Sequence, residues 1–319
     1  MLKVLELFGG IGACTKALKK LGIDFKVMDY VEINKHSVAS YNAINGTDFK
    51  PQDITKWDKQ LEVDFIMHGS PCTSFSLAGK QEGGDEGSGT PSSLMYETLR
   101  IVDKLRPKYV LWENVENLLS EHHRHNYDNY LNRMESFGYT NYYKVLESSN
   151  YGIPQTRRRV FTLSILGQSN YQFPPPQKLQ KSFYDYLEKD YDDSVVLTEH
   201  EKTMVRNFGA TYSFGGYVVK DKWVYPTITA SYGKVSGNSG KIRCGNNKFR
   251  ILTPRECWRL TGFDDIDFDK ASKVNEKSAL YKQAGNSIVV NVLEAILGSL
   301  FNIELPYTLA SQYKLKELF

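Results

Sequence analysis

The chain has 319 residues, of which 41% are hydrophobic, 24% charged and 13% aromatic, a composition typical of one large globular domain or two smaller ones. Collagen-like, low-complexity and wholly disordered chains are excluded. No window approaches the roughly 18 uninterrupted apolar residues of a membrane helix, and Glu6 interrupts the N-terminus before a signal-peptide core can form. The four cysteines form no CxxC pattern, which favours a reducing cytoplasm.

The net charge of +3 is unevenly distributed. Residues 201–255 contain ten lysines and arginines and only two acidic residues, a net charge of +8 for that segment. Such a segment in a near-neutral protein suggests a surface that faces a polyanion. Charge alone leaves a solvated, solubilising face as the alternative.

Strands alternate with helices in the first half of the chain. The apolar run at 3–8 ends in a glycine turn, and a helical pattern over 14–21 follows it. Further strands are predicted at 25–30, 65–67 and 109–112, with a helix at 35–41 after the second strand. This alternation predicts an α/β fold with a mostly parallel sheet that is covered on both faces.

The character of the sequence changes near Phe173-Pro-Pro-Pro176. Residues 172–251 are rich in Tyr, Gly, Ser and basic residues, with β-like pieces at 217–219 and 227–229, and predict a second, smaller and irregular domain. Helical periodicity then returns at 254–260 and 287–300.

The glycine turn after the first strand reads Phe8-Gly-Gly-Ile-Gly12. Such a turn lets a nucleotide-like ligand approach the backbone beside a helix N-terminus. Glu32 ends the second strand about 20 residues further on, where an acidic side chain can bind ribose hydroxyls. The residues after Gly12 do not complete GxGxxG, which favours an adenosine-containing ligand other than NAD. A packing role for the glycines is the alternative.

Two chemically capable side chains follow predicted strands. Cys72, in Gly-Ser-Pro-Cys, comes after the strand at 65–67, and Glu113 ends the run at 109–112. The carboxyl ends of parallel strands are where such sheets bind ligands. Cys72 is therefore a candidate nucleophile and Glu113 a candidate acid, with a buried structural cysteine and a structural ion pair as the alternatives.

A basic sequence, Gln155-Thr-Arg-Arg-Arg159, precedes a β-like run. Alternation along a strand places Arg157 and Arg159 on one face and Arg158 on the other. One face could point at an anionic substrate, and a basic surface strand is the alternative. The histidine cluster at 122–125 lacks metal-ligand spacing, so we predict no metal site and a solvated surface there.

Together these motifs resemble the cytosine-C5 DNA methyltransferase family, and the resemblance covers nearly the whole chain. The six motifs that carry it, in the family's order, are Phe8–Gly12, Pro71-Cys72, Glu113-Asn-Val115, Gln155–Arg159, Leu252-Thr-Pro-Arg-Glu-Cys-Trp-Arg-Leu-Thr-Gly-Phe263 and Tyr281-Lys-Gln-Ala-Gly-Asn-Ser287. The resemblance implies a Rossmann-like, class I methyltransferase fold. Its catalytic domain would comprise 1–171 and 252–319, and its target-recognition domain 172–251.

The resemblance also implies S-adenosylmethionine as cofactor, with S-adenosylhomocysteine as product. The cofactor residues that it assigns are Phe8, Gly10, Ile11, Gly12, Glu32, Ile33, Asp53, Ile54, Pro71, Leu94, Asn286 and Ser287. Glu32 would bind the ribose, and Asp53 with Ile54 the adenine. Asn286 and Ser287 would close the site from the far end of the sequence.

The implied reaction is site-specific methyl transfer to C5 of a cytosine flipped out of duplex DNA. Because C5 is a poor nucleophile, the thiolate of Cys72 would add to C6 and make C5 reactive. Glu113 would donate to N3 and Arg159 would stabilise O2, with Arg157 as a further catalytic candidate. The sequence does not identify the base that removes the C5 proton.

The expected partner is double-stranded DNA, with no membrane and no metal, and we expect a cytoplasmic monomer of prokaryotic or phage origin. A restriction endonuclease of the same system is a further candidate partner. The residues expected to contact DNA are Ser76, Lys80, Thr227, Lys234, Lys241 and Arg243. The loop at 79–93 would act as a lid over the flipped base, and glycine-rich loops at 207–216 and 233–245 would read base edges.

Two other functions fit parts of the pattern. A tRNA cytosine-C5 methyltransferase would share fold and motifs, but its relatives carry a Cys-Phe-Thr tripeptide after the recognition region, and this chain has none. A non-catalytic DNA-binding regulator could keep the fold. Retention of Cys72, Glu113 and Arg159 together argues against that reading.

Overall fold

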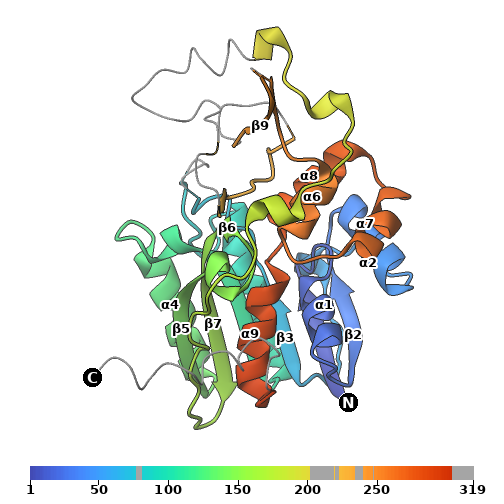
Figure 1. Cartoon of the computed structure of the whole chain (residues 1–319). Coiled ribbons are helices and arrows are strands. Elements are labelled where there is room, and N and C mark those ends of the chain that lie inside the picture. The colour runs from blue at the N-terminus through green and yellow to red at the C-terminus, as the bar shows by residue number, and fades with distance from the viewer. Residues whose placement is uncertain (77–80, 202–218, 220–222, 234–239, 247, 304–319) are drawn as a thin grey trace.

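The computed structural model describes residues 1–76, 81–201, 219, 223–233, 240–246 and 248–303, and its centre is a six-stranded sheet (Figure 1). The strand order is β2-β1-β3-β4-β7-β5. These strands are β1 (Leu2–Leu7), β2 (Phe25–Val31), β3 (Phe65–His68), β4 (Tyr109–Val115), β5 (Tyr139–Glu147) and β7 (Arg158–Leu166). Only β7 runs against its neighbours, so the sheet is mostly parallel, as the sequence predicts.

Helices cover both faces of this sheet. In the described residues they are α1 (Ala13–Lys20), α2 (Lys35–Asn45), α3 (Met95–Leu105), α4 (Arg124–Ser136), α6 (Pro254–Arg259), α7 (Asp265–Ser272), α8 (Lys277–Asn286) and α9 (Val290–Phe301). Helices α1 and α9 pack side by side against one face, and α3 and α4 contact each other against the opposite face (Figure 1).

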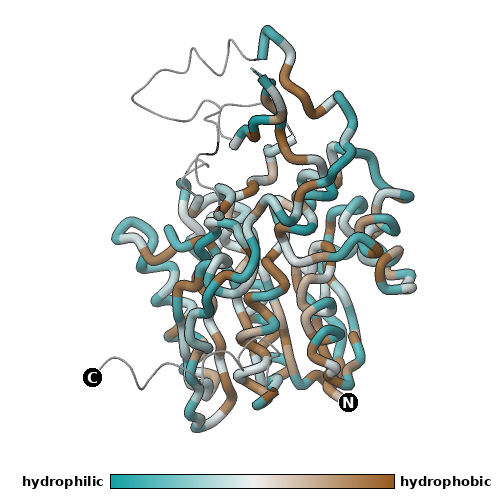
Figure 2. Tube along the Cα trace, in the orientation of Figure 1, coloured by the Kyte–Doolittle hydropathy of each residue, from teal (hydrophilic) through white to brown (hydrophobic). Residues whose placement is uncertain are grey.

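The strands divide their side chains between two apolar clusters. Val4 and Phe65 point into the cluster that contains α1 and α9, whereas their neighbours Leu5 and Ile66 point into the cluster that contains α3 and α4. All four side chains are fully buried. Successive residues of a strand face opposite sides, so a strand covered on both sides reads as a continuous apolar run. Figure 2 shows these hydrophobic stretches along the strands and along α9.

The C-terminal helix α9 packs against α1, the first helix of the chain. Lys20 of α1 forms an ion pair with Glu294 of α9, and the Tyr171 hydroxyl donates to the Ile296 carbonyl at 3.2 Å. By length and composition, the segment Lys277–Phe301 could cross a membrane, but 67% of its apolar window is buried inside the structure. It is therefore a core segment of this fold.

The described part of 172–251 lies above the carboxyl ends of the parallel strands (Figure 1) and has little regular structure. Strand β8 (Tyr225–Pro226) pairs with β6 (Gln155–Thr156), and β9 (Ile242–Gly245) pairs with β10 (Lys248–Arg250). The strand expected at 227–229 is wrong, because this backbone is irregular and bonds to side chains. The strand expected at 217–219 lies mostly outside the described residues.

Candidate active site

The turn after β1 has a backbone that requires glycine. Gly10 and Gly12 have φ angles of 55° and 85°, in the left-handed region that favours glycine. A Cβ on Gly12 would lie 2.8 Å from the Tyr41 ring, and a Cβ on Gly9 would collide with Tyr30. The glycines therefore let this turn pack closely against β2 and α2 and leave its backbone open to a ligand.

Glu32 holds this turn in place from the end of β2. Its carboxylate accepts hydrogen bonds from the Gly10 amide at 3.1 Å and from the Asn34 amide at 2.8 Å. Burial raises the pKa of Glu32, and these amide donors oppose that effect. The next residue, Ile33, is 68% exposed although it is apolar. An apolar surface thus lies directly beside a carboxylate.

A cavity of about 60 Å³ begins at the turn and joins residues from both ends of the chain. Its lining includes Phe8, Gly10, Ile11, Met67, Gly69, Glu113, Asn286, Ser287 and Ile288. The structure thus brings together the turn, the end of β3, β4 and the segment after α8. Five residues predicted for the cofactor and one predicted for catalysis line the same space.

The remaining predicted cofactor residues lie around the ends of β2 and β3. The Gln52 amide donates to the Glu32 carbonyl at 2.9 Å, which places Asp53 and Ile54 beside the end of β2. Asp53 itself accepts from the Thr55 amide, and Ile54 is buried. Ile54 belongs to the apolar cluster of α3 and α4, against which Phe8, Cys72 and Leu94 also pack, and Pro71 directly precedes Cys72.

Cys72, Glu113 and Arg159 come from three neighbouring parts of the sheet. Cys72 is partly buried in the loop after β3, and Glu113 lies inside β4. Because β7 is antiparallel to β4, Arg159 reaches Glu113, and its Nε lies 3.1 Å from Glu113 Oε1. A thiol, a carboxylate and a guanidinium therefore come together at one edge of the sheet, and the carboxylate also lines the cavity.

The surroundings of Cys72 favour its protonated thiol form over the thiolate. Burial raises its pKa and the Glu113 charge raises it further, whereas Arg159 and Arg157 lower it. The net shift is upward from an ordinary value that is already above neutrality. At neutral pH the side chain is thus protonated, and a nucleophilic role requires that its proton be removed when a substrate binds.

The two faces of the arginine triplet differ, as strand alternation predicts. Arg158 is exposed and pairs with Glu116 at 2.6 Å. Arg157 is only 4% exposed, and its guanidinium donates to the backbone carbonyls of Ile228 and of Gly285 and Ser287 at the end of α8. The prediction that Arg157 contacts an anionic substrate does not fit these bonds, because its donors are directed at neutral protein oxygens.

The predicted DNA contacts differ in their surroundings. Arg243 is exposed and lies over the Phe249 ring at 5.3 Å. The Thr227 hydroxyl donates to the Thr156 carbonyl, and the Ser76 amide to the Cys72 carbonyl at 2.9 Å. Lys80 and Lys234 lie outside the described residues.

The prediction that Lys241 contacts DNA is wrong. Its side chain is fully buried, and the neighbouring Ile242 is also inside. Burial lowers the pKa of Lys241 to about 8, while the Glu201 charge raises it. The Lys241 side chain is therefore part of the protein interior. The residue type alone does not show whether a lysine side chain faces solvent or the interior.

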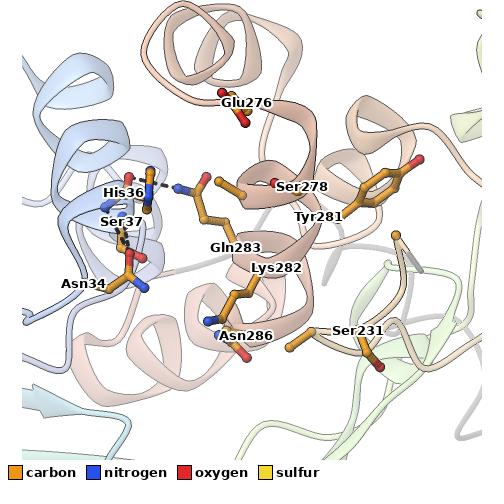
Figure 3. Close-up of a pocket in the computed structure, with 13 residues that line it drawn as sticks. Asn34, His36, Ser37, Ser231, Glu276, Ser278, Tyr281, Lys282, Gln283 and Asn286 are labelled. Atoms are coloured by element: carbon orange, nitrogen blue, oxygen red, sulfur yellow. Dashed lines mark hydrogen bonds between the residues drawn. The ribbon is translucent and has the colours of Figure 1, made fainter.

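A second cavity, of about 400 Å³, lies beside the first (Figure 3). Its lining includes Asn34, His36 and Ser37 at the start of α2, Lys282 and Asn286 of α8, and Ala230, Ser231 and Gly233. Asn286 lines both cavities. No sequence motif predicted that the start of α2 lines a cavity. The α8 side could have been predicted, because Lys282 and Asn286 are four residues apart and therefore lie on the same face of a helix.

The described part of the predicted lid is attached to α4. The Gly84 amide donates to Asn126 Oδ1 at 3.0 Å, and Asp85 contacts His125 at 2.8 Å. His123 is buried with its ring 5.3 Å from the Phe75 ring, so the prediction of a wholly solvated histidine cluster is wrong at that position. Among the described residues, no group of three or more His, Cys, Asp or Glu could hold a metal ion.

Glu6, which also lines the first cavity, is a buried acid in β1. It accepts hydrogen bonds from the hydroxyls of Thr15 and Tyr41. Burial raises the pKa of Glu6 from 4.5 to about 7, against the effect of these two donors. The folded protein therefore keeps a proton that the unfolded chain releases in mildly acidic solution.

This proton makes the stability of the protein depend on pH. The contribution of Glu6 is fully present below pH 4.5, and the free energy of unfolding decreases as pH rises to about 7, because the folded state binds more protons over this interval. Between pH 5 and pH 8, we expect the free energy of unfolding of Glu6→Gln to rise by roughly 2–3 kcal/mol relative to that of the wild type. Urea unfolding of both proteins at the two pH values measures this change, and a difference independent of pH would contradict it.

The comparisons with known proteins agree with this geometry. The family model described as C-5 cytosine-specific DNA methylase matches residues 2–302. Two relatives are the type II methyltransferases M2.ScrFI of Lactococcus lactis subsp. cremoris and M.HhaI of Haemophilus parahaemolyticus. Both are 32% identical, and the alignments cover 94% and 96% of this chain and 99% and 97% of the relatives.

Solved structures share the fold at lower identity. The chain is similar to the S. pombe Dnmt2 methyltransferase, with a TM-score of 0.74, 20% identity and coverage of 95% of this chain and 99% of the other. It is also similar to the Entamoeba histolytica methyltransferase EhMeth, with a TM-score of 0.76, 17% identity and coverage of 95% and 98%.

A mostly parallel α/β sheet with a glycine turn after its first strand, and a cysteine, a glutamate and an arginine at its edge, defines a class I methyltransferase. The chain belongs to the C-5 cytosine-specific DNA methylase family. It is an enzyme that methylates cytosine C5 in DNA.

Proposed function

We propose that this enzyme transfers a methyl group from S-adenosylmethionine to C5 of a cytosine flipped out of duplex DNA, through a covalent bond between Cys72 Sγ and C6. The observation that carries the proposal is the shared cavity. Glu113 lines the same space as the glycine turn and lies 3.1 Å from Arg159, with Cys72 close enough to both for their charges to shift its pKa.

The residues around the turn fit S-adenosylmethionine. The Glu32 carboxylate suits ribose hydroxyls, exposed Ile33 offers an apolar surface for the adenine, and the backbone of the turn suits the amino-acid end. When bound, the cofactor supplies a methyl group activated by its sulfonium. Because Glu113 lines the same cavity, the methyl group would be delivered beside the base-binding residues.

The chemistry then follows from three side chains. Cys72 loses its proton and adds to C6, while Glu113 donates a proton to N3 and Arg159 stabilises the charge on O2. C5 of the enamine so formed would accept the methyl group, and S-adenosylhomocysteine would leave as the bond between sulfur and the methyl group breaks. A base removes the C5 proton, N3 returns its proton, and the bond between C6 and sulfur breaks to restore the thiolate.

Duplex DNA and a cytoplasmic location belong to the same proposal. The relatives include type II methyltransferases and also orphan methyltransferases of Bacillus phages, so a cognate restriction endonuclease is proposed only as a candidate partner. We further propose that 1–171 and 252–319 form the catalytic domain and that 172–251 recognises the target sequence.

Bisulfite sequencing of DNA from cells that express the protein tests this function, because it reports the modified base and its sequence context together. We expect complete modification of one cytosine within one short motif. Cells that express Cys72→Ala serve as the control and should show none. Modified tRNA beside unmodified DNA, or modification without any sequence preference, would contradict the proposal.

Arg243 provides a test of target recognition. It is an exposed arginine on β9, within the segment proposed to contact DNA. A well-placed arginine contributes about 1–3 kcal/mol to base discrimination. We expect Arg243→Ala to weaken binding to the target duplex, or relax its sequence preference, by about 5- to 150-fold.

The affinity of Arg243→Ala for S-adenosylhomocysteine should stay unchanged. The exposed Lys144 on β5 supplies a matched control, because Lys144→Ala also removes one surface cation but lies on the edge of the central sheet. Equal effects of the two substitutions would mean that Arg243 contributes only general charge.

A further inference from the structure

Arg157 joins three parts of the chain through one buried side chain. Its Nη1 donates to the Ile228 carbonyl at 3.1 Å, and its Nη2 donates to the carbonyls of Gly285 and Ser287 at 3.2 and 2.9 Å. The planar guanidinium alone can hold three carbonyls in fixed directions in this way. Burial lowers the pKa of Arg157 to about 9, so the side chain remains charged at neutral pH.

The three carbonyls belong to segments with different proposed ligands. Gly285 and Ser287 flank Asn286, which lines both the cofactor cavity and the neighbouring cavity of about 400 Å³. Ile228 begins the segment 228–233, whose residues Ser231 and Gly233 line that second cavity (Figure 3). The guanidinium thus touches the cofactor side and the recognition side at once.

The two segments also contact each other directly. A Cβ added to Gly285 would overlap the Thr229 carbonyl, so the end of α8 lies against the recognition segment. The Ile228 amide donates to Gln155 Oε1 at 3.0 Å, and the Thr227 hydroxyl donates to the Thr156 carbonyl. Residues 155–157 therefore bind residues 227 and 228 of the proposed recognition domain, through the side chains of Gln155 and Arg157 and the backbone carbonyl of Thr156.

Arg157 also lies near Glu113, the proposed catalytic carboxylate. Among the described residues, neither Arg157 Nε nor Glu113 Oε1 has a hydrogen-bond partner, although Arg159 Nε lies 3.1 Å from Glu113 Oε1. Both residues line one cavity of about 10 Å³.

We propose that Arg157 is a positioning residue that couples cofactor binding to DNA binding. It acts through the carbonyls of Ile228, Gly285 and Ser287, so that ordering of the recognition segment by DNA also fixes Asn286 at the cofactor cavity. The proposal rests on the proposed function. By linkage, DNA must then tighten cofactor binding by the factor by which the cofactor tightens DNA binding.

The test measures this factor with S-adenosylhomocysteine as the probe. Its dissociation constant is measured with and without a duplex that carries the target found by bisulfite sequencing. We expect the duplex to tighten binding by roughly 5- to 150-fold in the wild type. In Arg157→Lys we expect the duplex to tighten S-adenosylhomocysteine binding by less than about two-fold, because one ammonium cannot hold the three carbonyls in place.

Arg158→Lys is the matched control, because Arg158 is exposed and pairs with the acidic side chains of Glu116 and Glu147. It should keep the wild-type factor. In steady state, Arg157→Lys should raise the KM for each substrate more than it lowers kcat. A purely structural arginine would instead lower the melting temperature and the active fraction and leave both KM values unchanged.

Several results would overturn the proposal. The proposal fails if the duplex does not change the dissociation constant of S-adenosylhomocysteine in the wild type. It also fails if a folded Arg157→Lys protein shows the same duplex-induced tightening as the wild type. If Arg157→Lys does not fold, Thr227→Val provides a second test, because it removes the neighbouring hydrogen bond to the Thr156 carbonyl. The duplex should then tighten S-adenosylhomocysteine binding several-fold less than in the wild type. Unchanged tightening in Thr227→Val counts against coupling. Absence of DNA methylation by the wild type would instead refute the proposed function.

Discussion

Replacement of Cys72 with alanine should reduce methyl transfer to the background level and leave cofactor binding nearly intact. The thiol acts only on the base in the proposed mechanism, and Cys72 does not line the cavity formed by the glycine turn. The measurement is transfer of labelled methyl groups to duplex DNA, together with binding of S-adenosylhomocysteine. DNA that contains 5-fluorocytosine should trap the wild type as a covalent complex and should not trap Cys72→Ala.

Cys244→Ser supplies the control for this experiment. Cys244 is the other partly exposed cysteine, whereas Cys14 and Cys257 are buried. Cys244→Ser should still form the covalent complex, which shows that trapping requires the thiol at position 72. Methyl transfer clearly above background in Cys72→Ala would refute the covalent mechanism.

Replacement of Glu113 with glutamine should lower the single-turnover rate by about 10²- to 10⁴-fold, the usual contribution of a positioned acid or base. An amide keeps the shape of the side chain but cannot supply a proton to N3 in the same way. Binding of duplex DNA should survive. Rapid-quench measurement at saturating substrate separates this effect on the rate from an effect on binding.

Glu116→Gln is a close control, because Glu116 lies three residues further on and pairs with exposed Arg158. Its rate should stay near that of the wild type. If Glu113→Gln also kept the wild-type rate, the carboxylate would serve only to balance the charge of Arg159.

The sequence predicted the sheet and much of the cavity for a physical reason. Strands buried on both faces, such as β1 and β3, form short continuous apolar runs that end at recognisable turns. The carboxyl ends of such strands meet at one edge of the sheet, so Gly10 and Glu113 could be expected at one site. These inferences need only local pattern and the general behaviour of parallel sheets.

Other features could not be predicted because they depend on tertiary contacts. The burial of Lys241 depends on how an irregular segment packs, and its residue type suggested the opposite. The bonds of Arg157 run to carbonyls 71 to 130 residues away, which no local pattern encodes. The irregular backbone at 227–229 arises because Gln155 satisfies the Ile228 amide that a strand neighbour would otherwise bind.

The position of residues 286–288 beside the glycine turn has a consequence during synthesis. The cofactor cavity needs Gly10 from the beginning of the chain and Asn286 from near its end. A nascent chain on the ribosome therefore lacks a complete cavity until α8 and the residues that follow it have emerged. We expect chains terminated before α8 to bind no cofactor, because they lack Asn286, Ser287 and Ile288 of the cavity.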